Sequence, residues 1–399
     1  MEFEKIGVVG LGYVGLPVAS LFSDKFDTTG FDINFSRVER VNNNNSYIED
    51  IEDNELTNLE ATIDFKLLGD MDVVIICVPT PLNKDNTPDI SAIKEVVNDI
   101  KQSHKKEQLV VLESTTYPGC TREVIKGGLE DLDIHAAFSP ERINPGNKKN
   151  LADIPKVIGG VTEEAADLAY SLYDEIFSDI FRANDAETAE MSKLLENTFR
   201  NVNIGLVNEL ARAIEDIDIN EVIDAAASKP YGFMEFRPGP GIGGHCIPID
   251  PYYLVHGLDK KLPIVESGTK SNEKMRAYTI GRMIEVSSKI NKNLTEIKVL
   301  MLGLAFKKNV SDYRNSPSVE IYKKLKDIDI EVDYSDPYIP QYRDDSSVSI
   351  TPNNLQKYDL VMITTAHDNI DYDIVLNNAE LILDTRGVYG TESDNLHKL

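Results

Sequence analysis

The sequence predicts an α/β protein in which two doubly wound parallel-sheet domains are joined by a helical segment. Three observations support this fold class. Short apolar runs alternate with helical patterns at the start of the chain, a long helical pattern begins near residue 186, and a second alternation begins near residue 297. The 399 residues also exceed one typical core, so more than one domain is expected.

The first alternation begins with an apolar, strand-like run over residues 6–9. A glycine-rich turn and a helical pattern over 16–22 follow, and a second strand ends at Asp32. Further buried strands are predicted at 73–78 and 109–112. Strands that alternate with helices in this way favour a parallel sheet.

The middle of the chain has a different pattern. Residues 186–217 contain no proline and carry apolar residues near helical spacing, which predicts one long helix that braces two domains or forms a dimer seam. A Pro/Gly-rich loop follows over 229–251, and strands are predicted again at 297–302, 360–364 and 381–383. We therefore expect domains at 1–185, 186–290 and 291–399.

The composition restricts the possible partners. Lys and Arg number 41 against 67 Asp and Glu, a net charge of −26, which disfavours nucleic acid as a ligand. An anionic substrate would need local basic groups and backbone amides. Three cysteines, a charged N-terminus and no apolar run of about 18 residues indicate a cytoplasmic protein without a membrane segment.

The glycine-rich turn has the pattern of a dinucleotide site. Gly10, Gly12 and Gly15 follow a strand and open a helix, and Asp32 lies 17 residues beyond Gly15. The glycines and the helix N-terminus suit a pyrophosphate, and Asp32 suits a ribose diol, which favours NAD over NADP. The alternative is a tight strand–helix turn without a ligand.

Cys246 is the candidate nucleophile. It lies in a glycine-dense loop, residues 237–250, rather than in an apolar strand, and His245 and Asp250 lie close enough in sequence to orient a thiol. Adjacent His and Cys side chains do not readily share one tetrahedral metal, so we expect no metal. Cys77, in an apolar run, is expected to be a core residue, and Cys120 a turn residue.

Three other groups have a polar role or an ordinary structural one. Lys193 and Asn197 share one helix face, where they would stabilise an oxyanion and hold a water, or would simply face solvent. Glu141, after an apolar run, is a candidate base or an ion-pair partner of Arg142. The basic stretch 306–316 suits phosphate or uracil, or is ordinary surface charge.

Taken together, the ordered motifs resemble the nucleotide-sugar 6-dehydrogenase family, which includes the UDP-glucose and UDP-N-acetylhexosamine dehydrogenases. The resemblance covers nearly the whole chain. Its motifs are GLGYVGLP at 10–17, CVPTP at 77–81, ESTTYPG at 113–119, SPER at 139–142, KLLENTFR at 193–200, GPGIGGHCIPIDP at 239–251, GLAFKKNVSDYRNSP at 303–317 and DTRG at 384–387.

The resemblance implies a Rossmann-like fold for both sheet domains, NAD as cofactor, a UDP-sugar as substrate and a homodimer through the long helix. It implies a catalytic group of Cys246 as nucleophile, Lys193, Asn197 and Asp250 as its polar partners, and Thr115 and Glu141 as the pair that handles water. The implied NAD contacts are Gly10, Gly12, Tyr13, Val14, Gly15, Asp32, Thr80 and Arg386. The implied substrate contacts are Arg237, Gly243, Lys307 and Arg314, some of them across a dimer.

The implied reaction is a four-electron oxidation of a C6 hydroxyl to a carboxylate. An aldehyde forms first, Cys246 adds to it, a second oxidation leaves a thioester, and water releases the acid. The first base is either Asp250 or a water ordered by Lys193.

Two departures from the UDP-glucose pattern indicate the N-acetylhexosamine branch. The chain has Arg-Ile-Asn-Pro-Gly at 142–146 and Ile-Pro-Ile-Asp at 247–250. We therefore favour UDP-N-acetylglucosamine, with the galactosamine and mannosamine epimers and UDP-glucose as alternatives. Two other classes stay open, a two-electron hydroxy-acid dehydrogenase, which would not need Cys246, and a nucleotide-sugar sensor, which would bind without producing NADH.

Overall fold

The computed structural model describes residues 2–48, 50–142, 151–214, 217–390 and 392–399. The chain divides into two compact units, Met1–Glu196 with Tyr252–Lys261, and Asn197–Pro251 with Leu262–Leu399. We describe each unit by itself. Because this division separates two compact units and not three domains, it does not test the predicted domain boundaries near residues 185 and 290, which stay a prediction.

The first unit is built on one sheet with the strand order β3-β2-β1-β4-β5-β6-β7-β8. Its strands are β1 (Lys5–Val9), β2 (Asp27–Phe31), β3 (Glu60–Thr62), β4 (Val73–Ile76), β5 (Gln108–Leu112), β6 (Ile134–Phe138), β7 (Lys156–Gly160) and β8 (Ile180–Arg182). Its helices include α1 (Gly15–Ser23), α2 (Phe35–Asn42), α3 (Ser91–Ser103) and α4 (Glu163–Asp174), with shorter turns η1 (Asp53–Leu56), η2 (Phe65–Asp70), η3 (Thr121–Lys126) and η4 (Leu151–Asp153). Neighbouring strands pair in parallel from β3 to β6, whereas β7 runs antiparallel to β6.

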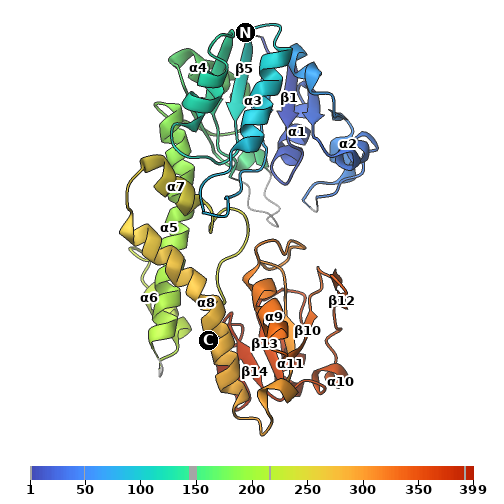
Figure 1. The fold of residues 1–399 in the computed structure, drawn as a ribbon, viewed down its shortest axis with the longest axis vertical. Coiled ribbons are helices and arrows are strands. Elements are labelled where there is room, and N and C mark those ends of the chain that lie inside the picture. The colour runs from blue at the N-terminus through green and yellow to red at the C-terminus, as the bar shows by residue number, and fades with distance from the viewer. Residues whose placement is uncertain (1, 49, 143–150, 215–216, 391) are drawn as a thin grey trace. The chain divides into compact units, whose positions relative to one another are not determined.

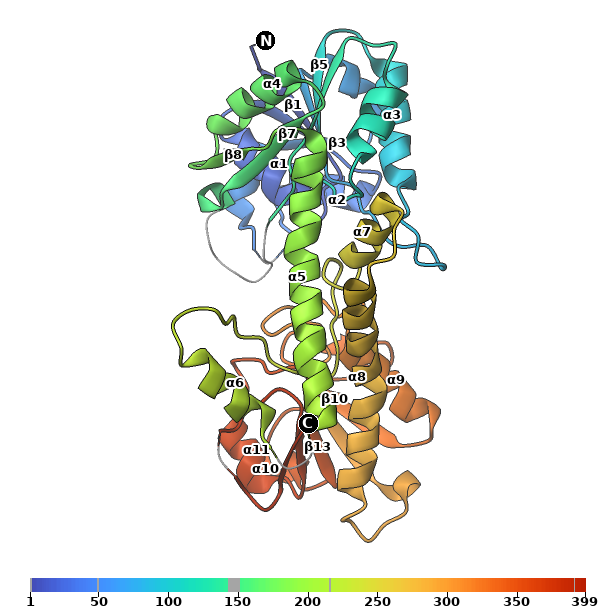
Figure 2. The ribbon, with the colours of Figure 1, turned by 90° about the vertical axis from the view of Figure 1, so that its left-hand side faces the viewer.

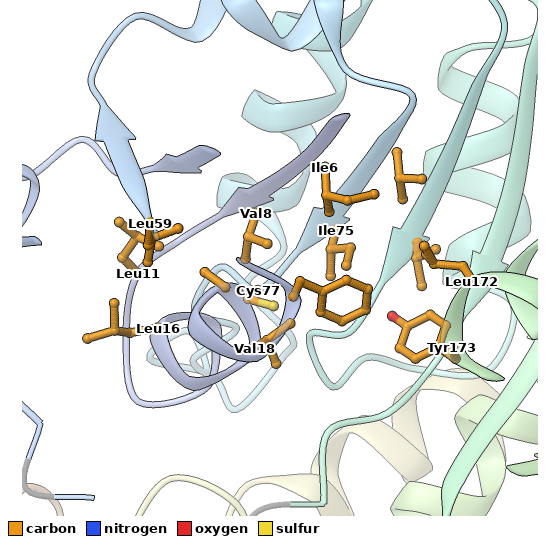
Figure 3. Close-up of a cluster of buried hydrophobic side chains, with 14 of the residues drawn as sticks. Ile6, Val8, Leu11, Leu16, Val18, Leu59, Ile75, Cys77, Leu172 and Tyr173 are labelled. Carbon is orange, nitrogen blue, oxygen red and sulfur yellow. The ribbon is translucent and has the colours of Figure 1, made fainter. Parts of the chain in front are cut away.

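Alternating strand residues bury the two faces of this sheet under different helices (Figure 1). Val8 and Ile75 belong to a core cluster with α1 and α4, while Val9 and Ile76 belong to one with α3. Figure 3 shows part of the first cluster, in which the side chain of Cys77 lies among apolar neighbours. Both faces are covered, as a doubly wound sheet requires.

The second unit contains a parallel sheet with the order β10-β9-β13-β14-β15. Its elements are α6 (Ile219–Ala227), α8 (Pro263–Ser287), η5 (Leu294–Glu296), β9 (Lys298–Leu302), α9 (Pro317–Asp327), β10 (Glu331–Ser335), the hairpin β11 (Gln341–Tyr342) and β12 (Asp345–Ser346), α10 (Pro352–Leu355), β13 (Leu360–Ile363), α11 (Tyr372–Asn378), β14 (Ile382–Asp384) and β15 (Leu396–Lys398). Helices α8 and α9 cover one face, and α10 and α11 the other.

Two helices contain the boundary between the units, α5 (Ala186–Ala213) and α7 (Asp250–Leu258). Figure 2 shows α5 as one uninterrupted helix. It ends before the predicted residue 217, since Asp218 already caps α6 by accepting a hydrogen bond from the Asn220 amide. The C-terminal half of α5 packs closely on α8. The backbones approach so closely that a Cβ on Gly205 would lie 2.6 Å from the Gly268 carbonyl oxygen.

The two sheets begin with the same turn. Gly10 follows β1 with φ +93°, and Gly303 follows β9 with φ +92°. In each case the next amide, of Leu11 or Leu304, donates to an aspartate that follows the neighbouring strand. The second unit therefore repeats the turn of the first without its full set of glycines. The predicted fold class, two doubly wound sheets joined along the chain by a helical segment with a long helix, is confirmed.

Candidate active site

In the first unit, the predicted cofactor and water-handling residues gather at one edge of the sheet. The glycine turn, Asp32, Thr80, Thr115 and Glu141 follow β1, β2, β4, β5 and β6 respectively. These strands are adjacent and parallel, so their carboxyl ends lie at the same edge. This edge is where doubly wound sheets bind ligands.

The glycine turn shows which glycines the fold itself needs. A Cβ on Gly10 would lie 2.8 Å from the Cys77 carbonyl oxygen, and one on Gly15 only 1.8 Å from the Gly10 carbonyl oxygen. A Cβ on Gly12 would meet no atom within 4 Å. A tight turn without a ligand explains Gly10 and Gly15 but not Gly12, whereas a close-approaching pyrophosphate explains all three.

The surroundings of the turn also fit NAD. Helix α1 begins at Gly15, its N-cap residue Val14 makes no side-chain capping hydrogen bond, and its first turn has no acidic residue, so its N-terminal amides suit an anion. Tyr13 is exposed beside it. Asp32 is buried and accepts hydrogen bonds from the Leu11 amide at 2.9 Å and the Asn34 amide at 2.8 Å. Bound NAD would rest its pyrophosphate on the turn and its ribose hydroxyls at Asp32.

Glu141 and Lys193 lie together in the first unit. The Lys193 Nζ donates to the Glu141 carbonyl oxygen at 2.7 Å, and both side chains are buried. The ion-pair alternative with Arg142 is wrong, because Arg142 pairs with Glu196 at 2.7 Å, whereas the Glu141 carboxylate accepts from Lys156 at 2.8 Å. Thr115 is half-buried after β5. In the stretch 142–146, which distinguishes the two branches, residues 143–146 lie outside the described residues.

In the second unit, Cys246 is exposed in a loop that buried hydrogen bonds hold in place. The Asn197 Nδ2 donates to Asp250 Oδ2 at 2.5 Å, and the Asp250 amide donates to the Cys246 carbonyl oxygen at 2.9 Å. Asn197 and Asp250 are buried, so the alternative of a solvated helix face is wrong for Asn197, as it is for Lys193.

The Cys246 loop packs against the predicted substrate segment 306–316. A Cβ on Gly243 would lie 2.7 Å from the Asn315 carbonyl oxygen and 2.9 Å from the Phe306 Cβ. Gly244 has φ +87° and lies against the Phe306 ring. Its carbonyl oxygen accepts a hydrogen bond from Asn315 Nδ2 at 3.4 Å. The loop that carries Cys246 therefore packs against the segment that carries Lys307 and Arg314.

Charges around this loop are locally paired. Arg314 Nη2 lies 2.8 Å from Asp312 Oδ2; burial raises the pKa of Asp312, but Arg314 outweighs burial and the net pKa is lowered. Burial, assisted by Arg314, lowers the pKa of His245, so its ring is mostly neutral at pH 7. Arg237 binds Asp224 and Glu235.

Arg386, a predicted cofactor contact, belongs to the unit that contains Cys246. Its Nε donates to the Thr364 carbonyl oxygen at 2.7 Å, and a Cβ on Gly239 would lie 2.7 Å from its Nη1. Burial lowers its pKa to about 10, so it remains charged at neutral pH. Its cofactor role stays a prediction.

The other two cysteines are core residues. Cys77 is buried in the first cluster, as predicted. Cys120, expected to be a turn residue, directly follows the turn at 118–119 and is fully buried in the second cluster at the start of η3. Among the described residues, no group of three or more His, Cys, Asp or Glu could hold a metal ion, and no helix is long and apolar enough to span a bilayer.

The chain belongs to the UDP-glucose/GDP-mannose dehydrogenase family, an NAD-dependent class of nucleotide-sugar oxidoreductases. The family's NAD binding domain matches residues 4–177, its central domain 187–274 and its UDP binding domain 300–391. The open position at Gly12 and the exposed Cys246 beside the segment 306–316 agree with this assignment.

Within the family, the chain is similar to UDP-N-acetylhexosamine dehydrogenases. It is 37% identical to UDP-N-acetyl-D-glucosamine 6-dehydrogenase of Pseudomonas aeruginosa, over 92% of this chain and 91% of the relative. It is 34% identical to UDP-N-acetyl-D-mannosamine dehydrogenase of Methanocaldococcus jannaschii, over 98% and 93%. The solved UDP-D-ManNAc dehydrogenase of Pyrococcus horikoshii superposes with a TM-score of 0.90 at 31% identity, covering 99% and 98%.

Proposed function

We propose that this protein oxidises the C6 hydroxyl of UDP-N-acetylglucosamine to the carboxylate, reducing two NAD⁺ per sugar through a covalent intermediate on Cys246. The observation that carries the proposal is the exposed thiol, in a glycine loop packed on the segment of Lys307 and Arg314. A two-electron dehydrogenase or a sensor has no use for such a nucleophile.

The chemistry follows from what each group can do. NAD⁺, when bound, accepts a hydride in each of two oxidations. Between them, the Cys246 sulfur adds to the aldehyde and forms a thiohemiacetal, and the second oxidation converts this to a thioester. Water then adds to the thioester carbonyl, the C–S bond breaks, and the acid leaves while the thiol is restored.

The polar residues have distinct proposed roles. Asp250 is fixed by Asn197 and by its own amide, so it is a candidate for the first base, together with a water ordered by Lys193. Glu141 and Thr115 handle the water that releases the acid. Lys307 and Arg314 bind the diphosphate or the uracil, and Arg237 and Gly243 complete the proposed substrate contacts.

The choice of sugar rests on the chain's sequence at 247–250 and on its relatives. Curated relatives that act on the glucosamine and on the mannosamine epimer match at 37% and 34% identity, so UDP-N-acetylmannosamine is the second candidate. UDP-glucose is the third. The glucosamine and mannosamine sugars differ by one inverted carbon centre, and an enzyme distinguishes them by the geometry of its pocket. The substrate is therefore assigned by a direct assay.

We also propose a homodimer through α5. Leu195, Phe199, Leu206 and Leu210 recur at helical spacing and are 59%, 44%, 55% and 42% exposed. Such a stripe on one helix face is typical of an interface between copies. Light scattering should give twice the chain mass, 2 × 44.5 kDa, and Leu206→Lys should give the monomer mass. A cytoplasmic location, suggested by three free cysteines, is likewise part of the proposal.

The test of the activity is the NADH yield per sugar with limiting UDP-N-acetylglucosamine, UDP-N-acetylmannosamine and UDP-glucose in parallel. Two NADH from the glucosamine and little from the others support the proposal, and two from another sugar would replace the substrate and keep the mechanism. No NADH from any UDP-sugar, with binding intact, would favour the sensor. Cys246→Ser should abolish acid formation while NAD affinity stays near normal.

A further inference from the structure

A buried ionic cluster lies behind Glu141 in the first unit. Lys156 Nζ lies 2.8 Å from Glu141 Oε2 and 3.1 Å from Glu113 Oε1. The Tyr173 hydroxyl donates to Glu113 Oε1 at 2.5 Å. These four side chains are almost fully buried. Figure 3 shows the Tyr173 hydroxyl pointing toward the neighbouring side chains of the cluster.

The charge of this cluster is nearly balanced. Burial lowers the pKa of Lys156, but Glu113 and Glu141 outweigh burial and the net pKa is raised, so Lys156 is a cation. Burial raises the pKa of Glu113, and Oε2 of that side chain has no hydrogen-bond partner. Glu113 therefore keeps a proton more readily than an exposed glutamate does, and the Lys156 cation lies 2.8 Å from Glu141 as its counterion.

The antiparallel strand β7 explains how Lys156 meets Glu141. In the pairing of β6 with β7, Phe138 lies opposite Gly159 and Ala137 opposite Gly160. Continued three residues beyond Phe138, this register places Lys156 opposite Glu141. Side chains directly opposite each other on antiparallel chains are close neighbours, so one reversed strand supplies the cation.

Lys156 itself has little freedom. Its amide donates to the Asp179 carbonyl oxygen at 2.9 Å, and its Nζ lies 5.5 Å and 5.2 Å from the ring centroids of Tyr173 and Phe177. Burying such an ion pair costs desolvation free energy that apolar residues of similar volume would avoid. The stability of the fold alone therefore does not explain why an ion pair is present here.

We propose that Lys156, fixed by Glu113 and Tyr173, is a positioning residue that orients the Glu141 carboxylate toward the water that releases the acid product. This inference rests on the proposed function, in which Glu141 handles that water. In this step water adds to the thioester carbonyl, the C–S bond breaks, the electron pair goes to sulfur, and the proton leaves through Glu141. Lys156 touches neither the water nor the sugar and acts through Glu141 alone.

The experiment measures acid release separately from oxidation. Four proteins are compared, namely wild type, Lys156→Met, Glu141→Gln and the double variant. Each is mixed with saturating NAD⁺ and UDP-sugar and quenched in acid, and the mass of the intact protein is then measured. Because an oriented base contributes about 10²–10⁴-fold to such a step, Lys156→Met should slow acid release tenfold or more. The protein should then carry the sugar on Cys246 after a burst of about two NADH per site, whereas a general loss of structure would abolish the burst.

The double variant tests whether Lys156 acts through Glu141. If it does, Lys156→Met/Glu141→Gln should release acid no more slowly than Glu141→Gln alone, since coupled residues are not additive. Release by Lys156→Met at the wild-type rate, or two independent and multiplying losses, would overturn the proposal. Should Lys156→Met fail to fold, Lys156→Arg, which retains a cation of different reach, carries the same comparison.

Two controls separate the possible failures. Lys105→Met removes a lysine whose Nζ pairs with Asp70 at the surface, and it should leave release unchanged. Wild type that forms no NADH from any UDP-sugar would refute the proposed function, an outcome visible before any variant is compared.

Discussion

Replacing Gly12 with alanine tests the cofactor site with little risk to the fold. A Cβ there would meet no atom within 4 Å, and Gly12 does not have a positive φ. The substitution should therefore leave the free energy of unfolding unchanged or raise it by about 0.4–1 kcal/mol, through the unfolded chain. Any loss of cofactor affinity in this variant then reports a lost contact between the turn and the cofactor, and not a damaged fold.

The expected loss follows from the chemistry of the turn. If the pyrophosphate passes over Gly12, a methyl group displaces it from the backbone amides and weakens one or two charge-assisted hydrogen bonds, about 1.5–3 kcal/mol in total. At about 1.4 kcal/mol per tenfold, the NAD⁺ Kd should rise roughly 10- to 150-fold.

The assay is a titration of NAD⁺ and of UDP-sugar, with denaturant unfolding in parallel. Gly281→Ala is the matched control, because its Cβ also meets no atom within 4 Å, but it lies in α8 of the second unit. Gly15→Ala is the opposite control and should unfold the turn, since its Cβ would lie 1.8 Å from a carbonyl oxygen. A Gly12→Ala protein that binds NAD⁺ as tightly as wild type would refute the placement of the pyrophosphate.

Three further substitutions test other parts of the site. Asp32→Ala should weaken NAD⁺ binding more than UDP-sugar binding, and should cost about 1–3 kcal/mol of stability because the buried Leu11 amide loses its acceptor; unchanged NAD⁺ affinity would remove Asp32 from the site. Lys307→Ala should raise the UDP-sugar KM with little change in kcat, and a normal KM would remove Lys307 from the substrate contacts. Burial raises the pKa of Glu190 from 4.5 to about 7 despite its hydrogen bonds. Its folded pKa exceeds the unfolded value, so its stabilising effect is complete below pH 4.5 and is lost as the pH rises through 7, by roughly 3 kcal/mol. Denaturant unfolding at pH 4.5, 6 and 8 should show a flatter profile for Glu190→Gln, and an identical slope would contradict this account.

The apolar strands and the long helix were predictable from local pattern. Residues 73–78 and 360–364 have little but apolar side chains, and both form central strands, β4 and β13. These features depend on neighbours in sequence, which is where periodicity carries information.

The ionic cluster was not predictable in the same way. Lys156 precedes the apolar residues 157–158 like any strand-end lysine, and Glu113 ends an apolar run like any surface carboxylate. Their meeting depends on strand β7 running against β6, a pairing that local sequence does not specify. The same reason explains why the sequence suggested only Arg142 as an ion-pair partner of Glu141, as the alternative to a catalytic base, and did not suggest Lys156.

The repeated turn of the two sheets has a consequence for tolerance to substitution over evolutionary time. Counted from Gly10 and Gly303, Gly12 and Ala305 occupy equivalent places. Ala305 is fully buried, so selection there acts on volume and permits only small side chains. Gly12 has empty space around it, so selection there acts through the bound cofactor. Homologues should therefore exchange small residues at position 305 while position 12 stays glycine, and a relative that has lost glycine at 12 should also have lost its dependence on NAD.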